Sequence, residues 1–212
     1  MQWRALLDFV FPAQCAACNG LGSGLCSICV PPDGAPLRVR VRGVSVTAHG
    51  WYEGALRAAI PALKDGRRDV AEALGERVAP LVERGAVLVP VPTSDVRRRV
   101  RGMDGVALVA ERAAQLAAAG VLCALQQRIG SAQHGRSRSQ RLAARGRFAA
   151  AGSLACRRVV LLDDVCTTGA TLEDCVRAVA AAGGRVEGAV VVAATKTNAR
   201  DQYPSFGTAE PN

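Results

Sequence analysis

Two adjacent carboxylates, Asp163 and Asp164, follow a short apolar run and precede a loop of small and hydroxyl-bearing residues. Ionised carboxylates only accept hydrogen bonds, so this pair could hold the two vicinal hydroxyl groups of a sugar. A glycine and hydroxyls at a helix start suit a phosphate, because free backbone N–H groups and the helix dipole attract an anion. Together these features predict a ribose 5-phosphate site. The loop residues assigned to it are Cys166, Thr167, Thr168, Gly169, Ala170 and Thr171.

The elements that position this loop are predicted from the apolar spacing around it. Residues 159–162 form a short apolar run that predicts a strand buried on both faces. Leu172, Val176 and Val179 recur at helical spacing, which predicts a helix over residues 172–182. Residues 190–194 should form a final strand beside residues 159–162. The loop lacks the Gly-Lys-Ser/Thr of a P-loop and the glycine pattern of a dinucleotide site, which disfavours those nucleotide-binding classes.

Residues 160–172, Val-Leu-Leu-Asp-Asp-Val-Cys-Thr-Thr-Gly-Ala-Thr-Leu, resemble the phosphoribosyl pyrophosphate motif of type I phosphoribosyltransferases. Nearly the whole chain resembles the ComF family of competence-associated proteins, which join an amino-terminal zinc module to such a domain. The resemblance implies an α/β fold with a parallel sheet and a Rossmann-like core. It also implies binding of phosphoribosyl pyrophosphate with Mg²⁺, and transfer of the phosphoribosyl group to an acceptor. Asp163 and Asp164 would then be the catalytic residues, holding the ribose diol and stabilising oxocarbenium charge.

A second buried strand is predicted within residues 85–92, Gly-Ala-Val-Leu-Val-Pro-Val-Pro. It resembles the family's first core strand, whose following loop binds pyrophosphate. Residues 101–105, Arg-Gly-Met-Asp-Gly, depart from the family's Arg-Gly-Phe-Asn-Gln. The candidates that this resemblance implies for the pyrophosphate loop are Thr93, Ser94, Asp95, Arg97 and Arg101.

Residues 128–147 are rich in arginine, glycine and serine and show little apolar periodicity. A polar basic segment of this length inside a domain favours a functional loop. It resembles the family's mobile loop that closes over phosphoribosyl pyrophosphate, with Arg138 and Arg141 as candidate contacts. A disordered surface loop and a nucleic-acid contact patch are the alternatives.

Residues 52–68 resemble a signature of the same family, which reads tyrosine-glycine-leucine-arginine followed by lysine-glycine-arginine. Lys64, Arg67 and Arg68 could contact phosphate, or they could simply complement the dipole at a helix end.

Four cysteines lie near the amino terminus as two Cys-x-x-Cys pairs, Cys15 with Cys18 and Cys26 with Cys29. This spacing lets four thiolates reach one tetrahedral ion, which predicts structural zinc. A closed four-thiolate site leaves no position for a substrate, so the metal should stabilise a module with little core of its own. Disulfides are the alternative, and the absence of a secretion signal disfavours them.

The composition predicts a globular protein that binds anions. The net charge of +9 in 212 residues comes almost wholly from arginine, which favours phosphates or nucleic acid as partners, although genome composition can also enrich arginine. No apolar run approaches the roughly 20 residues that span a bilayer, so we expect a cytoplasmic protein without membrane insertion.

Prolines and glycine at residues 31–36 indicate a linker. We therefore expect a zinc module over residues 1–36, a phosphoribosyltransferase-type domain over 37–198 and a loose tail over 199–212. Three functions are compatible with the sequence: a transferase, a non-catalytic ligand-binding protein that assembles with competence or DNA-processing proteins, and a single-stranded DNA binder that uses the arginine clusters.

Overall fold

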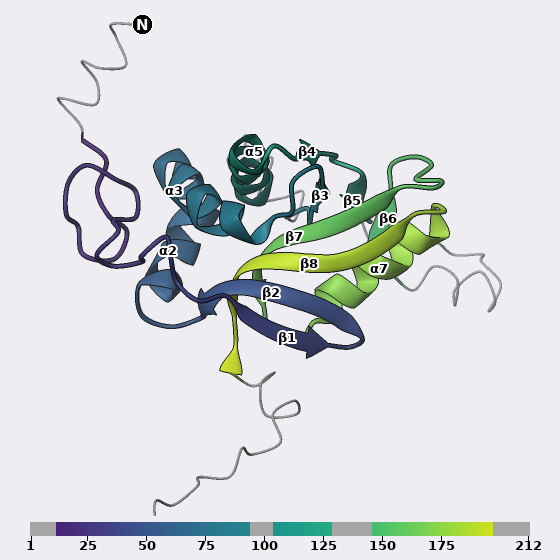
Figure 1. The fold of residues 1–212 in the computed structure, drawn as a ribbon, viewed down its shortest axis with the longest axis horizontal. Helices are drawn as coiled ribbons and strands as arrows, with labels where there is room; N and C mark the ends of the chain where they lie inside the picture. The colour runs from purple at the N-terminus through teal and green to yellow at the C-terminus, as the bar shows by residue number, and fades with distance from the viewer. Residues whose placement is uncertain (1–11, 94–103, 129–145, 197–212) are drawn as a thin grey trace, which may run out of the picture.

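The computed structural model describes residues 12–93, 104–128 and 146–196. The helices and strands of these residues alternate along much of the chain (Figure 1). They are β1 (Leu37–Val41), β2 (Val44–Trp51), α2 (Gly54–Lys64), α3 (Arg68–Val78), the short 3-10 helix η1 (Ala79–Leu81), β3 (Val87–Pro90), α5 (Gly105–Ala117), β4 (Gly120–Val121), β5 (Leu125–Gln127), β6 (Phe148–Ala150), β7 (Arg158–Cys166), α7 (Ala170–Ala181) and β8 (Arg185–Ala194).

The main sheet has six strands in the order β1-β2-β8-β7-β3-β4. Every neighbouring pair in it is parallel except β1 and β2, which form an antiparallel hairpin at one edge. Strands β5 and β6 form a separate antiparallel pair. This architecture confirms the predicted α/β class with a mostly parallel sheet.

The sheet is buried on both faces because helices cover each of them. Helices α2, α3 and α5 pack on one face in a cluster that includes Leu88, Leu162 and Val190. Helix α7 and the β5–β6 pair pack on the other face in a cluster that includes Leu161 and Val191. Neighbours along one strand thus point to opposite faces, which is why the central strands read as continuous apolar runs.

The central unit β7-α7-β8 differs from its prediction in length. Strand β7 pairs with β8 as far as Cys166, opposite Ala194, so Asp163 and Asp164 lie within the strand and do not follow it. Helix α7 begins at Ala170, two residues earlier than the apolar spacing indicated. Strand β8 lies beside β7 as predicted.

The segment before β1 packs against α3, although its described part forms only one isolated β-bridge. Cys15, Leu25 and Val30 are buried in the same cluster as α2, α3 and α5. The guanidinium of Arg77 on α3 is buried and donates hydrogen bonds to the carbonyls of Leu25 at 2.7 Å and Val30 at 3.3 Å. A buried charge of this kind needs such acceptors, so Arg77 joins the segment to the core.

None of the helices in the described part of the chain combines the length and apolar character needed to cross a membrane.

Candidate active site

The two carboxylates lie near the carboxyl end of β7 and are both buried, with 8% of Asp163 and 9% of Asp164 exposed. Asp163 accepts a hydrogen bond from the backbone N–H of Asp164 at 2.8 Å, and Asp164 accepts one from Val165 at 2.7 Å. The Nζ of Lys64, at the end of α2, lies 3.1 Å from Asp164 Oδ2. Alternation along the strand places Asp164 on the same face as Leu162 and α2, so a cation at the end of α2 can reach it.

Burial raises the pKa of Asp163 well above its ordinary value, and the neighbouring charge of Asp164 raises it further. The Asp164 backbone N–H and the charge of Lys64 act in the opposite direction without cancelling the increase. Two like charges this close resist joint ionisation. Asp163 therefore retains its proton more strongly than an ordinary aspartate does, and Asp164 lies next to an ammonium group.

The predicted phosphate loop connects this strand directly to a helix start. Residues 167–169 separate β7 from α7, and Gly169 has a φ of 71°, a left-handed conformation that favours glycine. The hydroxyl of Thr171 accepts a hydrogen bond from Arg147 Nη2 at 3.0 Å. The 12-residue helix α7 thus directs its N-terminal end at the same edge of the sheet as the two carboxylates. The structure brings the sugar and phosphate candidates together.

The candidate pyrophosphate loop begins at the same edge. Pro90 pairs with Leu162 in the sheet, so β3 ends beside the acid-bearing part of β7. The N–H and hydroxyl of Thr93 each donate to Asp104 Oδ2 at 3.1 Å. Asp104 Oδ1 also caps α5 by accepting from Val106 N–H at 3.0 Å.

One carboxylate therefore holds both ends of the loop. Of the pyrophosphate candidates only Thr93 is described, and the rest lie outside the described residues, namely Ser94, Asp95, Arg97 and Arg101.

The candidate lid is held at its base by a backbone contact. Arg128 N–H donates to the carbonyl of Arg147 at 2.7 Å, which extends the β5–β6 pairing. The N–H of Arg147 in turn donates to Asp174 on α7 at 2.7 Å. The lid candidates Arg138 and Arg141 lie outside the described residues. The base of this segment is thus attached to the first turns of α7, next to the phosphate loop.

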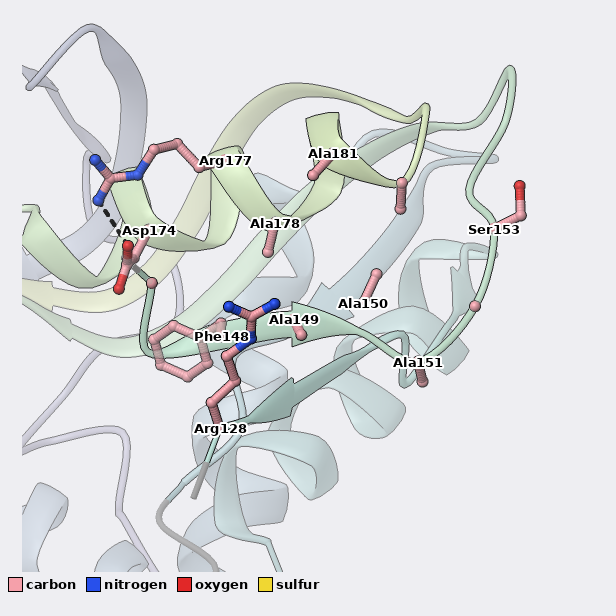
Figure 2. Close-up of a pocket in the computed structure, with 13 residues that line it drawn as sticks. Arg128, Phe148, Ala149, Ala150, Ala151, Ser153, Asp174, Arg177, Ala178 and Ala181 are labelled. Carbon is pink, nitrogen blue, oxygen red and sulfur yellow. Dashed lines mark hydrogen bonds and ion pairs between the residues drawn. The ribbon is translucent and has the colours of Figure 1, made fainter. Parts of the chain in front are cut away.

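A cavity of about 760 Å³ lies between α7 and β6 (Figure 2). Arg128, Phe148 and Arg177 line it, together with Asp174, whose carboxylate lies 2.6 Å from Arg177 Nη2. Neither the two β7 carboxylates nor residues 167–171 line it. It is therefore a different feature from the candidate site, which lies at the carboxyl ends of β7 and β3.

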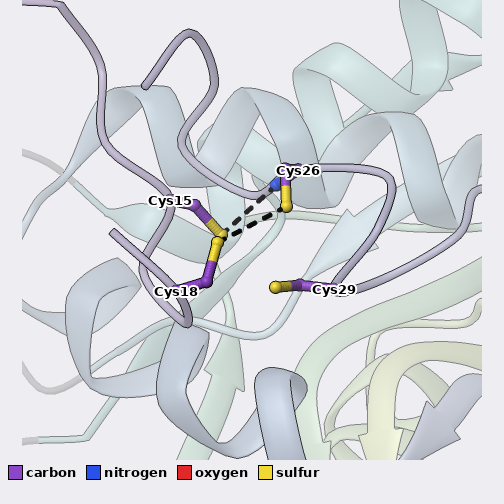
Figure 3. Close-up of side chains that lie close together, drawn as sticks. All are labelled: Cys15, Cys18, Cys26 and Cys29. Atoms are coloured by element: carbon purple, nitrogen blue, oxygen red, sulfur yellow. Dashed lines mark hydrogen bonds between the residues drawn. The ribbon is translucent and has the colours of Figure 1, made fainter. Parts of the chain in front are cut away.

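The four amino-terminal cysteines point toward one another (Figure 3), and their sulfur atoms all lie within 4.8 Å of each other. Burial opposes ionisation of Cys15, but backbone N–H groups of Cys26, Cys18 and Ala17 lower the pKa of this thiol to about 6. Hydrogen bonds with Cys18 and Cys26 raise the pKa of Cys29 to about 12. Four clustered thiols with N–H groups directed at sulfur are the donor set that Zn²⁺ prefers, so these residues fit the ion.

The three basic residues of the 52–68 signature separate in the structure. Lys64 contacts Asp164, whereas Arg67 pairs with Asp69 and donates to the carbonyl of Gln14. Arg68 lies exposed, 3.9 Å from Glu72 one helical turn away. Only Lys64 joins the candidate site, and its partner is a carboxylate.

Sequence reasoning missed three contacts at this site. Asp104 stands where the family has asparagine, and sequence reasoning treated it only as a departure from the family pattern. An aspartate just before a helical apolar pattern is nevertheless a helix-capping signal. Arg147 was placed in the lid without its link to Thr171. Arg42, which contacts the loop from the turn between β1 and β2, carried no signal in the sequence.

Comparison with known proteins adds a family to this geometry. Among solved structures, the chain is similar to the allosteric regulatory enzyme of purine biosynthesis, with 19% identity, a TM-score of 0.40 and coverage of 59% of this chain and 26% of that one. It is also similar to adenine phosphoribosyltransferase from Rhodothermus marinus DSM 4252, with 16% identity, a TM-score of 0.36 and coverage of 81% and 89%.

The chain spans about a quarter of the first of these proteins. No curated protein matches the sequence. Residues 77–211 match the sequence model of the phosphoribosyl transferase domain. Because this match covers more than half of the chain, the protein belongs to the phosphoribosyl transferase domain family.

Proposed function

We propose that this protein binds phosphoribosyl pyrophosphate with Mg²⁺ and transfers its phosphoribosyl group to an acceptor. The observation that carries the proposal is the meeting of Asp163, Asp164 and the phosphate loop at the carboxyl ends of β7 and β3. The family match supports this reaction class.

In this site each half of the substrate has its own set of residues. Asp163 and Asp164 accept hydrogen bonds from the ribose hydroxyls, and negative charge on the pair stabilises the positive charge that develops on the ring. Backbone N–H groups and hydroxyls of residues 167–171 bind the 5-phosphate. Thr93, whose N–H donates to Asp104, binds the pyrophosphate. Mg²⁺ held on the substrate's oxygens neutralises charge on the leaving group.

Two further assignments belong to the same proposal. Zn²⁺ bound by Cys15, Cys18, Cys26 and Cys29 stabilises the amino-terminal module. The combination of this module with the family domain supports membership of the ComF group, with the module over residues 1–36, the transferase-type domain over 37–198 and a tail beyond it. Binding of single-stranded DNA stays a prediction, because the arginines at 97–101 and 136–145 lie outside the described residues.

Calorimetric titration with phosphoribosyl pyrophosphate and Mg²⁺ tests the binding step. The double variant Asp163→Asn with Asp164→Asn should bind phosphoribosyl pyrophosphate at least about 100-fold more weakly. The reason is that both carboxyl groups that accept hydrogen bonds from the ribose hydroxyls are replaced by amides. The control is Glu72→Gln with Glu111→Gln, which removes two exposed carboxylates of α3 and α5 and should bind as the parent does. Equal affinity of the parent and the Asp163/Asp164 variant contradicts the proposal.

The transfer step needs its own measurement. Pyrophosphate release should depend on an acceptor when the protein is supplied with nucleobases, ammonia or amino compounds in turn. Tight binding without release for any of them would instead identify a non-catalytic ligand-binding protein.

A further inference from the structure

The tip of the β1–β2 hairpin lies against the outer side of the phosphate loop, far from it in sequence. Arg42 Nε donates to the carbonyl of Thr168 at 3.0 Å, and its Nη1 lies 2.9 Å from Glu173 on α7. A Cβ on Gly169 would lie 2.3 Å from Val41 Cγ1, so the loop can approach the hairpin only with a glycine at this position. The hairpin and the loop thus form one contact surface.

Arg42 makes this contact from an unfavourable backbone conformation. It has a φ of 50° and Gly43 one of 81°, and Val41 pairs with Val44 across a two-residue turn. Turns of this kind favour Asn or Gly at the first position, and a larger residue is strained there. Asparagine would suit the turn better, so the arginine side chain points to a requirement outside the turn.

The contact fixes the direction of the loop's peptide groups. In a trans peptide the carbonyl and the following N–H point in opposite directions. With the Thr168 carbonyl directed outward to Arg42, the N–H of Gly169 is directed inward. There it donates a hydrogen bond to the thiol of Cys166, although burial of this thiol still raises its pKa to about 11. The hydroxyl of Thr195 lies 3.4 Å from the carbonyl of Thr167, an arrangement that directs the N–H of Thr168 away from Thr195 in the same manner.

We propose that Arg42 is a positioning residue for phosphate binding: it holds the Thr168 carbonyl outward, so that this oxygen does not face the 5-phosphate and the loop keeps the shape that admits the anion. Arg42 need not touch the ligand, because its two partners are the Thr168 carbonyl and Glu173. The role rests on the proposed function, since it concerns the phosphate half of that site.

Arg42→Asn separates positioning from folding, because it removes the guanidinium and creates the Asn-Gly sequence that such turns favour. We expect the melting temperature to stay the same or rise while ribose 5-phosphate binds about tenfold more weakly in calorimetry. Binding of Mg²⁺-pyrophosphate should be unchanged, because its half of the site lies on β3. Arg42→Lys, which can donate to only one of the two partners, should give an intermediate affinity.

Arg177→Ala is the matched control. The variant removes a positive charge near Glu173, as Arg42→Asn does, since Arg177 Nη1 lies 4.0 Å from Glu173 Oε1. Unlike Arg42, Arg177 does not donate to the carbonyl of Thr168. Arg177→Ala should change ribose 5-phosphate affinity by less than about twofold. If Arg177→Ala loses as much ribose 5-phosphate affinity as Arg42→Asn, the effect is one of charge and the positioning role is overturned. The role is also overturned if Arg42→Asn keeps the parental affinity, or if it weakens binding of both ligands equally.

A measurement without ligand keeps the two proposals separate. The N–H of Glu173 donates to the carbonyl of Gly169 at 2.9 Å, so its hydrogen exchange reports on the order of the loop. Exchange should be faster in Arg42→Asn than in the parent and in Arg177→Ala. If the parent binds neither ligand, the proposed function fails, whereas unchanged exchange in Arg42→Asn overturns the positioning role itself.

Discussion

At the scale of single residues, two neighbouring aspartates occupy different environments. Asp164 faces α2 and has the ammonium group of Lys64 within 3.1 Å, whereas burial dominates the environment of Asp163. Burying a carboxyl without a full set of partners opposes folding, and such groups persist mainly where function needs them. The fold therefore carries a destabilising residue at the centre of its candidate site.

This environment predicts a pH dependence of stability. Between the ordinary pKa of 3.8 and the higher folded-state pKa of Asp163, the folded protein binds more protons than the unfolded chain. The contribution of Asp163 to stability is then complete at low pH and is lost as the pH rises through that window. Asp163→Asn cannot titrate, so its free energy of unfolding should exceed the parental value by an amount that grows as the pH rises from about 4 through that window.

Urea denaturation of the ligand-free proteins across this range measures the difference. Glu111→Gln, which removes an exposed carboxyl on α5, serves as the control and should show no such trend. A stability difference that is constant with pH, or that shrinks as the pH rises, contradicts the assignment.

At the scale of elements, the candidate site consists of strand ends held by caps and turns. Asp104 shows this most clearly, because it accepts from Thr93 with one oxygen and caps α5 with the other. Asp104→Ala should lower the free energy of unfolding by about 1–2 kcal/mol, the usual cost of a lost cap. Asp104→Asn should cost less, since asparagine also caps helices, and chemical denaturation distinguishes them. An alanine variant as stable as the parent would show that the cap contributes nothing.

The sequence was sufficient for the elements around the phosphate loop and insufficient for their contacts. Residues 159–162 and the spacing of Leu172, Val176 and Val179 predicted the strand and the helix around the loop, because burial on both sheet faces leaves a continuous apolar run. The strand reached Cys166 because pairing with β8 continues through the polar residues, which an apolar run cannot indicate. Lys64 and Asp164 lie far apart in the sequence, and only the fold brings them together.

At the scale of the whole molecule, the cysteine segment and the family domain share one core. Arg67 and Arg77 donate to carbonyls of the segment, and Cys15 is buried in the cluster formed by α2, α3 and α5. Because the metal would hold the segment in shape, its loss should affect the domain as well as the segment.

The double variant Cys15→Ser with Cys26→Ser tests this coupling. Mass spectrometry of the native protein should find one zinc ion per chain in the parent and none in the variant, because a tetrahedral site does not survive the loss of two thiolates. The variant should melt in a single transition at a lower temperature. Cys123→Ser with Cys156→Ser, two exposed cysteines outside the cluster, should leave both properties unchanged. A separate early transition, with the main one unmoved, would show independent units.

The pairing of β2 with β8 has a practical consequence for anyone who wishes to prepare a shorter protein. The family match begins at residue 77, inside α3, yet β2 covers one edge of β8 and α2 carries Lys64. A fragment that starts at residue 77 would expose the backbone groups along β8, and such open edges recruit other strands. Fragments cut at the family boundary should therefore aggregate, and shortening is better planned from the strand pairing than from the sequence match.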